Sequence, residues 1–310
     1  MTITFRLLLG LLVAAPLVGH TQTEPINGPK AVLVTGASTG IGRKITERLA
    51  ADGYFVYAGA RKDEDLKALG AIKNVQPIRL DVTKPDDIVT AVATVIKGGR
   101  GLYGLVNNAG IASRGSVADM KMEEFDLLMA VNVAGPVRVT RAFEPLIIAH
   151  QGRITTIGSI AGVLPNAGVP GNVPVTAYTM SKHAMEAFAD SLADQLQPQG
   201  VLVSIVEPGN YDSDIAKNSV LRTGGDPKRA SRSMFKPPDE VAAAVEQALF
   251  EPKPKRRYLV APTQNEAELT IRKQIEQLVQ LNEGQSYTFD RAALIKMLDE
   301  ALVGSRPKTH

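Results

Sequence analysis

The residues best suited to chemistry are a tyrosine and a lysine, Tyr178 and Lys182, which stand four positions apart. In a helix, side chains at this spacing lie on one face, one turn above the other. A free phenol has a pKa of ~10, and a proton donor that works near neutrality needs a value about three units lower. One positive charge ~4 Å away supplies ~1 kcal/mol in water but ~4 kcal/mol at an effective dielectric constant of ~20. The pair therefore predicts a proton donor that works inside a cleft, although the same spacing also occurs in ordinary pairs on helix surfaces.

A glycine-rich segment upstream, residues 35–42, reads Thr-Gly-Ala-Ser-Thr-Gly-Ile-Gly. It follows an apolar run, Ala31–Thr35, and precedes a helical pattern in which Ile41, Ile45 and Leu49 recur every fourth residue. Glycines let the backbone turn tightly beside a pyrophosphate, and a helix N-terminus offers unpaired N–H groups. A glycine cluster alone also predicts a simple tight turn, but its position between a strand and a helix favours dinucleotide binding. The candidate cofactor residues in this turn are Gly36, Ser38, Thr39, Gly40, Ile41 and Gly42.

The end of the second apolar run, Tyr54–Ala60, predicts which cofactor is preferred. An acidic side chain at such a position binds the 2′-hydroxyl of the adenosine ribose, whereas an arginine accommodates a 2′-phosphate. The chain has Arg61 here and no acidic residue before Asp63. NADP(H) is therefore predicted over NAD(H), with the alternative that Arg61 is a solvated loop charge. Asp81 and Val82, at the end of the third run, are predicted to meet the adenine ring, and Asp81 is alternatively a cap of the following turn.

Short apolar runs alternate with helical patterns from residue 31 onward, which is typical of a parallel sheet covered by helices on both faces. The runs show little polar alternation, as in strands that are buried on both faces. Seven strands are predicted, at Ala31–Thr35, Tyr54–Ala60, Val75–Val82, Gly104–Asn107, Arg153–Ile157, Val201–Val206 and Tyr258–Val260. Helical patterns include Asp86–Lys97, Glu123–Ala134, Tyr178–Gln197 and Asp239–Phe250. The sequence therefore predicts a doubly wound α/β domain of the Rossmann type.

The N-terminal segment, residues 1–27, differs in character from this domain. Arg6 is followed by an apolar run, residues 7–19, which is too short to span a bilayer but has the length of a signal-peptide core. The alternative is an apolar helix that packs on the domain or rests on a membrane. The sequence therefore predicts an exported or membrane-associated protein, with a cytoplasmic location as the alternative.

The alternation of strands and helices stops after Pro262. We therefore expect the main domain to occupy residues 28–262 and a helical extension to follow at 263–310. Periodicity predicts two helices in the extension, Glu266–Leu281 and Asp290–Leu302. Such an extension can enlarge the domain, cover a substrate cleft or make contacts between subunits, and the sequence leaves these three roles open.

Composition excludes several classes of site. Of the 310 residues, 44% are hydrophobic and 22% are charged, a balance typical of soluble globular proteins. The chain has no cysteine, which excludes disulfides, thiolate catalysis and cysteine-based metal sites. The four histidines show no metal-ligand spacing, so no metal site is predicted. The net charge of +3 is small, and the basic run Lys253–Arg257 has no aromatic residue that would stack on bases, so no nucleic-acid partner is predicted.

Taken together, the motifs resemble those of the classical short-chain dehydrogenases/reductases. The matching residues are Thr35-Gly-x-x-x-Gly-Ile-Gly42, Asp81, Asn107-Asn-Ala-Gly110, Asn132, Ser159, Tyr178-x-x-x-Lys182 and Pro208-Gly209. All of them occur in the order found in the family, over roughly residues 30–262. The resemblance implies a Rossmann-type fold that binds a nicotinamide cofactor and interconverts alcohols and carbonyl compounds. Within the family, the chain looks most like members that act on steroids, retinol or similar lipophilic alcohols and ketones.

The resemblance also implies a role for each matching residue. Tyr178 would be the general acid/base, and Lys182 would lower the pKa of Tyr178 and hold the nicotinamide ribose. Ser159 would hydrogen-bond the reacting oxygen, and Asn132 would position a water molecule for proton relay. Simpler roles are a turn residue for Ser159 and a buried core amide for Asn132. The remaining implied cofactor contacts are Asn108, Ala109 and Gly110 on the adenosine side and Pro208 and Gly209 at the nicotinamide.

The sequence departs from the family pattern at two places. The interval between Ser159 and Tyr178 is longer than usual, and the surplus lies in a segment rich in glycine and proline, Val163–Thr176. This segment is expected to border the substrate and to reshape the pocket. After Gly209 the chain reads Asn-Tyr-Asp-Ser, where family members usually have a threonine that binds the nicotinamide amide, so Ser213 is the predicted substitute.

Two alternative functions stay open at this point. An epimerase or dehydratase of the extended relatives shares the Tyr-x-x-x-Lys motif, but its glycine spacing differs from the one found here. A non-catalytic nucleotide-binding protein on the same fold is the other alternative, although such a protein has no use for a proton-transferring pair. The predicted function is therefore hydride transfer between NADP(H) and a small secondary alcohol, ketone or aldehyde. The family also implies a homodimer or homotetramer.

Overall fold

The computed structural model describes residues 28–165, 174–222 and 235–304 of the chain. The predicted signal-like segment, residues 1–27, lies outside the described residues, as does part of the segment Val163–Thr176. Among the described residues, no helix has the length and apolar character needed to cross a membrane. The export or membrane association expected from the N-terminal segment therefore stays a prediction.

Seven parallel strands form one sheet in the described part of the chain, in the order β3-β2-β1-β4-β5-β6-β7. They are β1 (Ala31–Val34), β2 (Phe55–Ala60), β3 (Val75–Arg79), β4 (Gly104–Asn107), β5 (Arg153–Ile157), β6 (Leu202–Pro208) and β7 (Arg257–Val260). The predicted strands are thus confirmed, and the largest difference is at β3, which ends before Val82. The reason is that its neighbour β2 ends at Ala60, where the strand pairing stops. Asp81 then turns the chain by accepting hydrogen bonds from the backbone and hydroxyl of Thr83.

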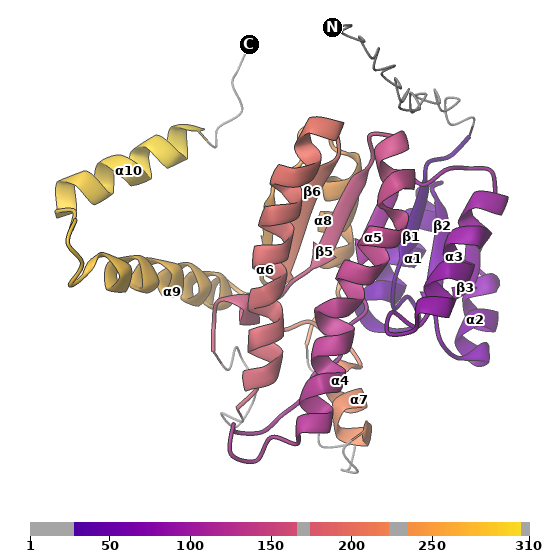
Figure 1. Cartoon of the computed structure of the whole chain (residues 1–310), viewed down its shortest axis with the longest axis horizontal. Helices are drawn as coiled ribbons and strands as arrows, with labels where there is room; N and C mark the ends of the chain where they lie inside the picture. Colours follow the sequence, from indigo (N-terminus) through magenta and orange to yellow (C-terminus); the bar gives the residue numbers. More distant parts are fainter. Residues whose placement is uncertain (1–27, 166–173, 223–234, 305–310) are drawn as a thin grey trace, which may run out of the picture.

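Helices cover both faces of the sheet (Figure 1). One face carries α1 (Gly40–Ala51), α2 (Asp63–Gly70) and α8 (Asp239–Phe250), and the other carries α3 (Pro85–Lys97), α5 (Ala134–Ala149) and α6 (Thr176–Leu196). Because side chains alternate along a strand, Val32 and Val34 pack against the first layer and Leu33 against the second. Strand β1 is therefore apolar on both faces, which explains its continuous apolar run in the sequence.

Some helices are not evident from the sequence pattern. The helix expected at Glu123–Ala134 is α4 (Met122–Asn132), and after one intervening residue the chain continues as α5. The sequence does not reveal α5 because Pro136 lies in its first turn and Pro145 in its interior, where proline removes a backbone hydrogen bond. The short helices α2 and α7 (Ile215–Arg222) also escape detection, since eight residues leave little periodicity to detect.

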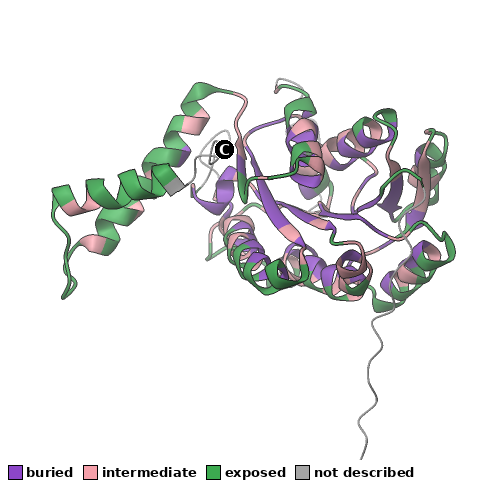
Figure 2. Ribbon diagram, turned by 90° about the horizontal axis from the view of Figure 1, so that it is seen from above, coloured by how far each residue is buried: buried purple, intermediate pink, exposed green. Residues whose placement is uncertain are grey.

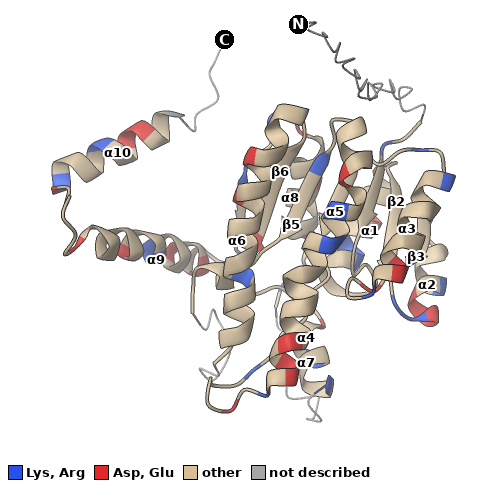
Figure 3. Ribbon diagram, viewed as in Figure 1, with Lys and Arg blue, Asp and Glu red and all other residues tan. Residues whose placement is uncertain are grey.

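The C-terminal extension is helical, as predicted, and consists of α9 (Gln264–Asn282) and α10 (Arg291–Gly304). Figure 1 shows α9 leaving the body of the molecule and α10 lying beyond it. Both helices are largely exposed (Figure 2), and charges of both signs are spread along them (Figure 3). Of the described side chains in α9, only Thr270 is buried. The extension therefore meets the sheet domain through the first turns of α9.

Candidate active site

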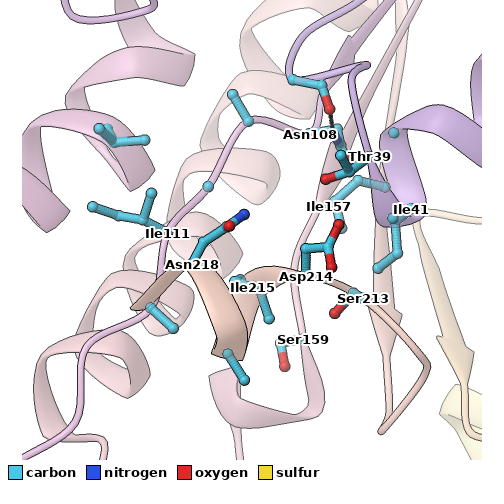
Figure 4. A pocket seen from close by; sticks show the side chains of 18 of the residues that line it. Thr39, Ile41, Asn108, Ile111, Ile157, Ser159, Ser213, Asp214, Ile215 and Asn218 are labelled. Carbon is cyan, nitrogen blue, oxygen red and sulfur yellow. Dashed lines mark hydrogen bonds between the residues drawn. The ribbon is translucent and has the colours of Figure 1, made fainter. Parts of the chain in front are cut away.

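A cavity of about 510 Å³ opens at the edge of the sheet where the strands have their carboxyl ends. In a parallel sheet all these ends lie on one edge, so loops that are distant in the sequence meet there. Figure 4 shows side chains from the glycine turn, from the end of β5 and from residues 213–218 around the same space. Every predicted site residue other than Asn132 lines this cavity, namely Gly36, Ser38, Thr39, Gly40, Ile41, Gly42, Arg61, Asp81, Val82, Asn108, Ala109, Gly110, Ser159, Tyr178, Lys182, Pro208, Gly209 and Ser213.

Close packing of the backbone in the glycine turn requires glycine at two positions. Gly36 has a φ of +64°, and a Cβ there would lie 2.9 Å from the Cα of Ala109. A Cβ at Gly42 would lie 2.2 Å from the carbonyl oxygen of Gly36. Distances this short leave no room for any side chain. Glycine at these two positions therefore lets α1 start directly against the turn, with its N-terminus toward the cavity.

The segment after β4 holds the glycine turn in shape. The Thr35 hydroxyl oxygen accepts hydrogen bonds from the backbone N–H groups of Asn108, at 2.9 Å, and Ala109, at 3.0 Å. In return, the side-chain amide of Asn108 donates to the carbonyl oxygens of Thr35, at 2.8 Å, and Gly36, at 3.0 Å. Asn108 therefore braces the turn, in addition to lining the cavity as the sequence predicts.

The end of the cavity near β2 and β3 carries charges of both signs. Arg61 is 65% exposed, and one of its guanidinium nitrogens lies 3.9 Å from the carboxylate of Asp81. Burial alone would raise the pKa of Asp81, but hydrogen bonds from Thr83 and the charge of Arg61 outweigh burial and lower this pKa. Asp81 is therefore a carboxylate at neutral pH. Lys62 and Asp65 also line this end of the cavity, and the sequence analysis did not single them out.

Tyr178 and Lys182 lie in the first turns of α6, as their spacing predicts. The Lys182 ammonium donates a hydrogen bond of 2.7 Å to the carbonyl oxygen of Ile157 and lies 5.6 Å from the centre of the Tyr178 ring. Lys182 is buried, and burial lowers its pKa to about 8, partly opposed by the charge of Glu186 on the next turn. At neutral pH Lys182 is therefore protonated in most molecules and places a positive charge beside the Tyr178 ring.

Ser159 lies two residues after the end of β5 and caps the short 3-10 helix Ile160–Gly162. Its hydroxyl oxygen accepts a hydrogen bond of 3.0 Å from the backbone N–H of Ala161. This bond occupies a lone pair and orients the hydroxyl, whose hydrogen can still be donated. Ser159 is thus both the turn residue of the simpler expectation and a cavity-lining hydroxyl.

Asn132 lies behind the cavity wall. Its amide oxygen accepts from the backbone N–H of Ile111 at 2.8 Å, and its amide nitrogen donates to the Ile111 carbonyl oxygen at 2.8 Å and to the Ser181 hydroxyl at 3.0 Å. Ser181 in turn donates to the carbonyl oxygen of Tyr178 at 2.7 Å. Asn132 therefore links α4, the chain after β4 and the start of α6, as a buried core amide does. A role in holding a water molecule stays a prediction.

Several cavity residues carry no signal in the sequence. They include Ile111, Ala112 and Arg114 after β4, Asn210 and Tyr211 after β6, and Asp214, Ile215, Asn218 and Arg222 at α7. Arg222 holds α7 in place, because its guanidinium donates to the Ala112 carbonyl oxygen at 2.6 Å and pairs with Glu124 at 2.8 Å. These contacts join residues about a hundred positions apart, so no local pattern could reveal them.

The segment Val163–Thr176, expected to border the substrate, reaches the cavity through Val175. Val175 forms an isolated parallel bridge with Gly115, whose N–H donates to the Pro174 carbonyl oxygen at 2.9 Å. Residues 166–173 lie outside the described part of the chain. The described end of the segment therefore packs on the loop after β4, beside Tyr178.

Known proteins have similar sequences and folds. A family model described as short chain dehydrogenase matches residues 30–223. The mitochondrial D-beta-hydroxybutyrate dehydrogenase of Bos taurus is 37% identical over 218 residues, which are 65% of this chain and 61% of that protein. Retinol dehydrogenase 5 of Mus musculus is 36% identical over 226 residues, 70% of this chain and 68% of that protein. The crystal structure of a short-chain dehydrogenase from Streptomyces avermitilis has a TM-score of 0.67 at 29% identity, covering 83% of this chain and 98% of that chain.

The match to the family model extends over more than half of the chain. It includes the glycine turn, the start of α6 and the loop after β6, which together line the cavity. The chain spans about three fifths of the length of the D-beta-hydroxybutyrate dehydrogenases that it matches. By this match and by its sheet topology, the chain belongs to the short-chain dehydrogenase family.

Proposed function

We propose that the protein is an oxidoreductase that transfers a hydride between NADP(H) and a secondary alcohol or ketone, or an aldehyde and its primary alcohol. The observation that carries the proposal is the presence of Tyr178, Lys182 and Ser159 in the same cavity as the glycine turn. A nucleotide-binding protein without catalytic activity has no need for a phenol beside a buried ammonium. This arrangement is therefore the strongest argument for catalysis.

The cavity suits a dinucleotide along its whole length. A Cβ at Gly40 would lie 3.2 Å from the Cβ of Ser213, so glycine lets the loop after β6 pack closely on the glycine turn. Backbone N–H groups at the start of α1, where residues 38–42 line the cavity, suit a pyrophosphate. Arg61 and Asp81 would hold the adenosine, and Lys182 and Gly209 the nicotinamide riboside. When bound, the cofactor supplies the donor or acceptor of the hydride.

Tyr178 would move the proton. During oxidation its phenolate would take the proton from the alcohol oxygen as the carbon that bears this oxygen gives up a hydride, and a carbonyl group would remain. During reduction the phenol returns the proton to the carbonyl oxygen. The Lys182 ammonium stabilises the phenolate by charge, and the Ser159 hydroxyl donates a hydrogen bond to the reacting oxygen and holds it beside Tyr178.

A preference for NADP(H) is supported by the end of β2. Ala60, the last residue of the strand, offers no carboxylate to the ribose, and Arg61 follows it as an exposed cation. The 3.9 Å separation from Asp81 leaves the guanidinium free to turn toward a 2′-phosphate. Asp65 is the one acidic residue of the following helix that lines the cavity, and it is the feature that would favour NAD(H) instead.

A lipophilic substrate is supported by the wall around Ser159. Ile111, Ile160, Val175 and Ile215 all line the cavity and offer apolar contact to the body of an alcohol. Retinol dehydrogenase 5 is named for such a substrate, whereas the hydroxybutyrate dehydrogenases are named for a small hydroxy acid. We therefore infer an alcohol with an apolar body, acted on at a secondary or primary hydroxyl.

The test is to screen the purified protein against alcohols and ketones while following nicotinamide absorbance. Tyr178→Phe removes only the ionisable oxygen, so it should lose at least ~10²–10⁴-fold in turnover and keep its cofactor affinity. Wild-type turnover by this variant would refute the role of Tyr178. Isomerisation of a substrate without net change in absorbance would indicate an epimerase, and cofactor binding without turnover of any compound would indicate a binding protein.

The assembly and location remain part of the proposal. The family resemblance supports a homodimer or homotetramer, which sedimentation of the full-length protein would distinguish from a monomer. Export or membrane association through residues 1–27 would be seen by fractionating cells that express the full chain and a chain without this segment.

A further inference from the structure

Glu266, in the first turn of α9, reaches back to the loop that follows β6. Its Oε2 accepts a hydrogen bond of 2.8 Å from the backbone N–H of Asn210 and one of 3.2 Å from the side-chain amide of Asn210. Asn210 is buried, with 6% of its surface exposed. Hydrogen bonds between a carboxylate and buried N–H groups are stronger than neutral ones. One oxygen of the extension therefore anchors a residue that lines the cavity.

Gly209, the preceding residue, shows how closely this carboxylate packs. A Cβ built on Gly209 would lie 2.3 Å from Oε2 of Glu266 and 2.7 Å from the Cδ of Pro262. Glycine is therefore needed for the carboxylate to reach the backbone of the loop. The Gly209 N–H also donates to the Val260 carbonyl oxygen at 2.8 Å. The loop is thus held from two sides, by the end of β7 and by α9.

The backbone of Glu266 takes part in two hydrogen bonds with side chains of α9 and of its N-cap residue. Its backbone N–H donates to the hydroxyl of Thr263, the N-cap residue, at 3.2 Å, and its carbonyl oxygen accepts from the buried Thr270 hydroxyl at 2.8 Å. Thr263 and Glu266 have the spacing of a capping box, in which the glutamate side chain returns to the backbone of the cap. Here Oε2 is directed to Asn210 instead. The helix therefore presents this carboxylate to the loop.

We propose that Glu266 is a positioning residue for the nicotinamide end of the cofactor site, so that α9 completes a site that begins at the glycine turn. The inference rests on the proposed function, since it concerns support for the same cavity. The adenosine end is built from residues near β1, β2 and β3, whereas the side chain of Glu266 accepts hydrogen bonds from Asn210, after β6. Loss of Glu266 should therefore weaken binding at one end of the cofactor only.

The experiment compares two probes, NADPH and 2′,5′-ADP, which lacks the nicotinamide. Glu266→Ala should weaken NADPH binding by up to about tenfold, because part of the binding free energy must then order the loop that Glu266 holds in wild type, and should leave 2′,5′-ADP binding unchanged. If wild type prefers NAD(H), NADH and ADP serve as the probes. Glu266→Gln keeps an acceptor oxygen and should restore most of the affinity. Glu268→Ala is the matched control, because Glu268 lies on the same helix, is exposed and pairs only with Arg272 among the described residues.

The outcomes separate this inference from the proposed function. Equal weakening of both probes in Glu266→Ala would mean that α9 merely stabilises the fold, and unchanged binding of both would mean that the loop is held without Glu266. Either result overturns the inference while leaving hydride transfer by wild type intact. If wild type binds neither nicotinamide cofactor, the proposed function fails instead. If Glu266→Ala does not fold, Glu266→Asp withdraws the carboxylate by one methylene and carries the same expectation.

Discussion

The side-chain ammonium of Lys182 lies 2.7 Å from the main-chain carbonyl oxygen of Ile157, the last residue of β5. This hydrogen bond joins α6, which carries Tyr178, to the strand that leads into Ser159. The relative position of the phenol and the serine hydroxyl therefore depends on the same lysine that supplies the positive charge. Lys182 is expected to have both an electrostatic and a positioning role.

Lys182→Met should raise the pH at which alcohol oxidation becomes efficient, because the phenolate of Tyr178 loses its stabilising charge. Cofactor binding should weaken as well. The measurement is the pH profile of kcat/KM together with cofactor titration. Lys44→Met is a suitable control, since Lys44 lies on the exposed side of α1 and pairs with Asp239. An unchanged pH profile and unchanged affinity in Lys182→Met would contradict this role.

The difference in stability between Lys182→Met and wild type should depend on pH. Burial lowers the pKa of Lys182 from 10.5 to about 8. Between these values the unfolded chain binds more protons than the folded one, so the stability of wild type rises with pH across this window. The free energy of unfolding of Lys182→Met, relative to that of wild type, should thus be highest at pH 8 and below. This relative stability should decrease by on the order of 3 kcal/mol toward pH 10.5. Urea unfolding of both proteins without cofactor measures this stability difference at each pH. A difference that does not change with pH would refute the prediction.

Arg61→Ala should lower the affinity for NADP(H) roughly ten- to hundredfold, which corresponds to one hydrogen bond to a charged group. Affinity for NAD(H) should change much less, since it has no 2′-phosphate. Ala60→Asp should shift the preference further, because its carboxylate repels the phosphate and can bind the free ribose hydroxyls. Both cofactors are titrated at fixed salt. Equal weakening of both cofactors in Arg61→Ala would make the arginine structural, and a wild type that prefers NAD(H) would show that the NADP(H) prediction is wrong.

Glu186→Gln should remove a pH dependence of stability. Burial and the neighbouring Glu207 raise the pKa of Glu186 to about 8, although Arg257 opposes them. Between its ordinary value of 4.5 and about 8 the folded state binds more protons, so wild-type stability falls as pH rises through this window. Glutamine cannot titrate, so the stability of the variant should fall less over the same pH range. Thermal unfolding from acid to alkaline pH tests this, with Asp194→Asn as the control because Asp194 is an exposed carboxylate of the same helix that pairs with Arg256. Equal slopes for wild type and Glu186→Gln would argue against a protonated Glu186.

Gly42→Ala should damage the cofactor turn. The added Cβ would lie 2.2 Å from the Gly36 carbonyl oxygen and 2.3 Å from the side-chain amide nitrogen of Asn108. Overpacking of this kind destabilises by about 1–3 kcal/mol, and here it also displaces the backbone that would hold the pyrophosphate. We expect a lower melting temperature and weaker binding of both NADP(H) and ADP. Gly70→Ala, where the nearest contact would be an ordinary 3.4 Å, should leave both properties nearly unchanged. If the two variants behaved alike, the turn would be more tolerant than its geometry implies.

The sequence by itself determined the elements whose signals are local. Gly104–Asn107 and Arg153–Ile157 were predicted with both ends correct, since short aliphatic runs between helical patterns are typical of strands buried on both faces. The turn after β1 was evident from its glycines, because close backbone approach admits no side chain there. The proximity of Tyr178 and Lys182 followed from helical periodicity alone.

Only the tertiary structure decided which side chains surround these elements. The periodicity of α4 does not show that Asn132 bonds to Ile111 behind the cavity wall, and that of α9 does not show that Glu266 reaches Asn210, a residue 56 positions away. The same holds for Arg222, which connects α7 to the loop after β4. Such contacts form because a parallel sheet places the carboxyl ends of its strands at one edge and brings distant loops together. No periodicity within a single helix or strand encodes them, because their partners are set by the packing of the whole chain.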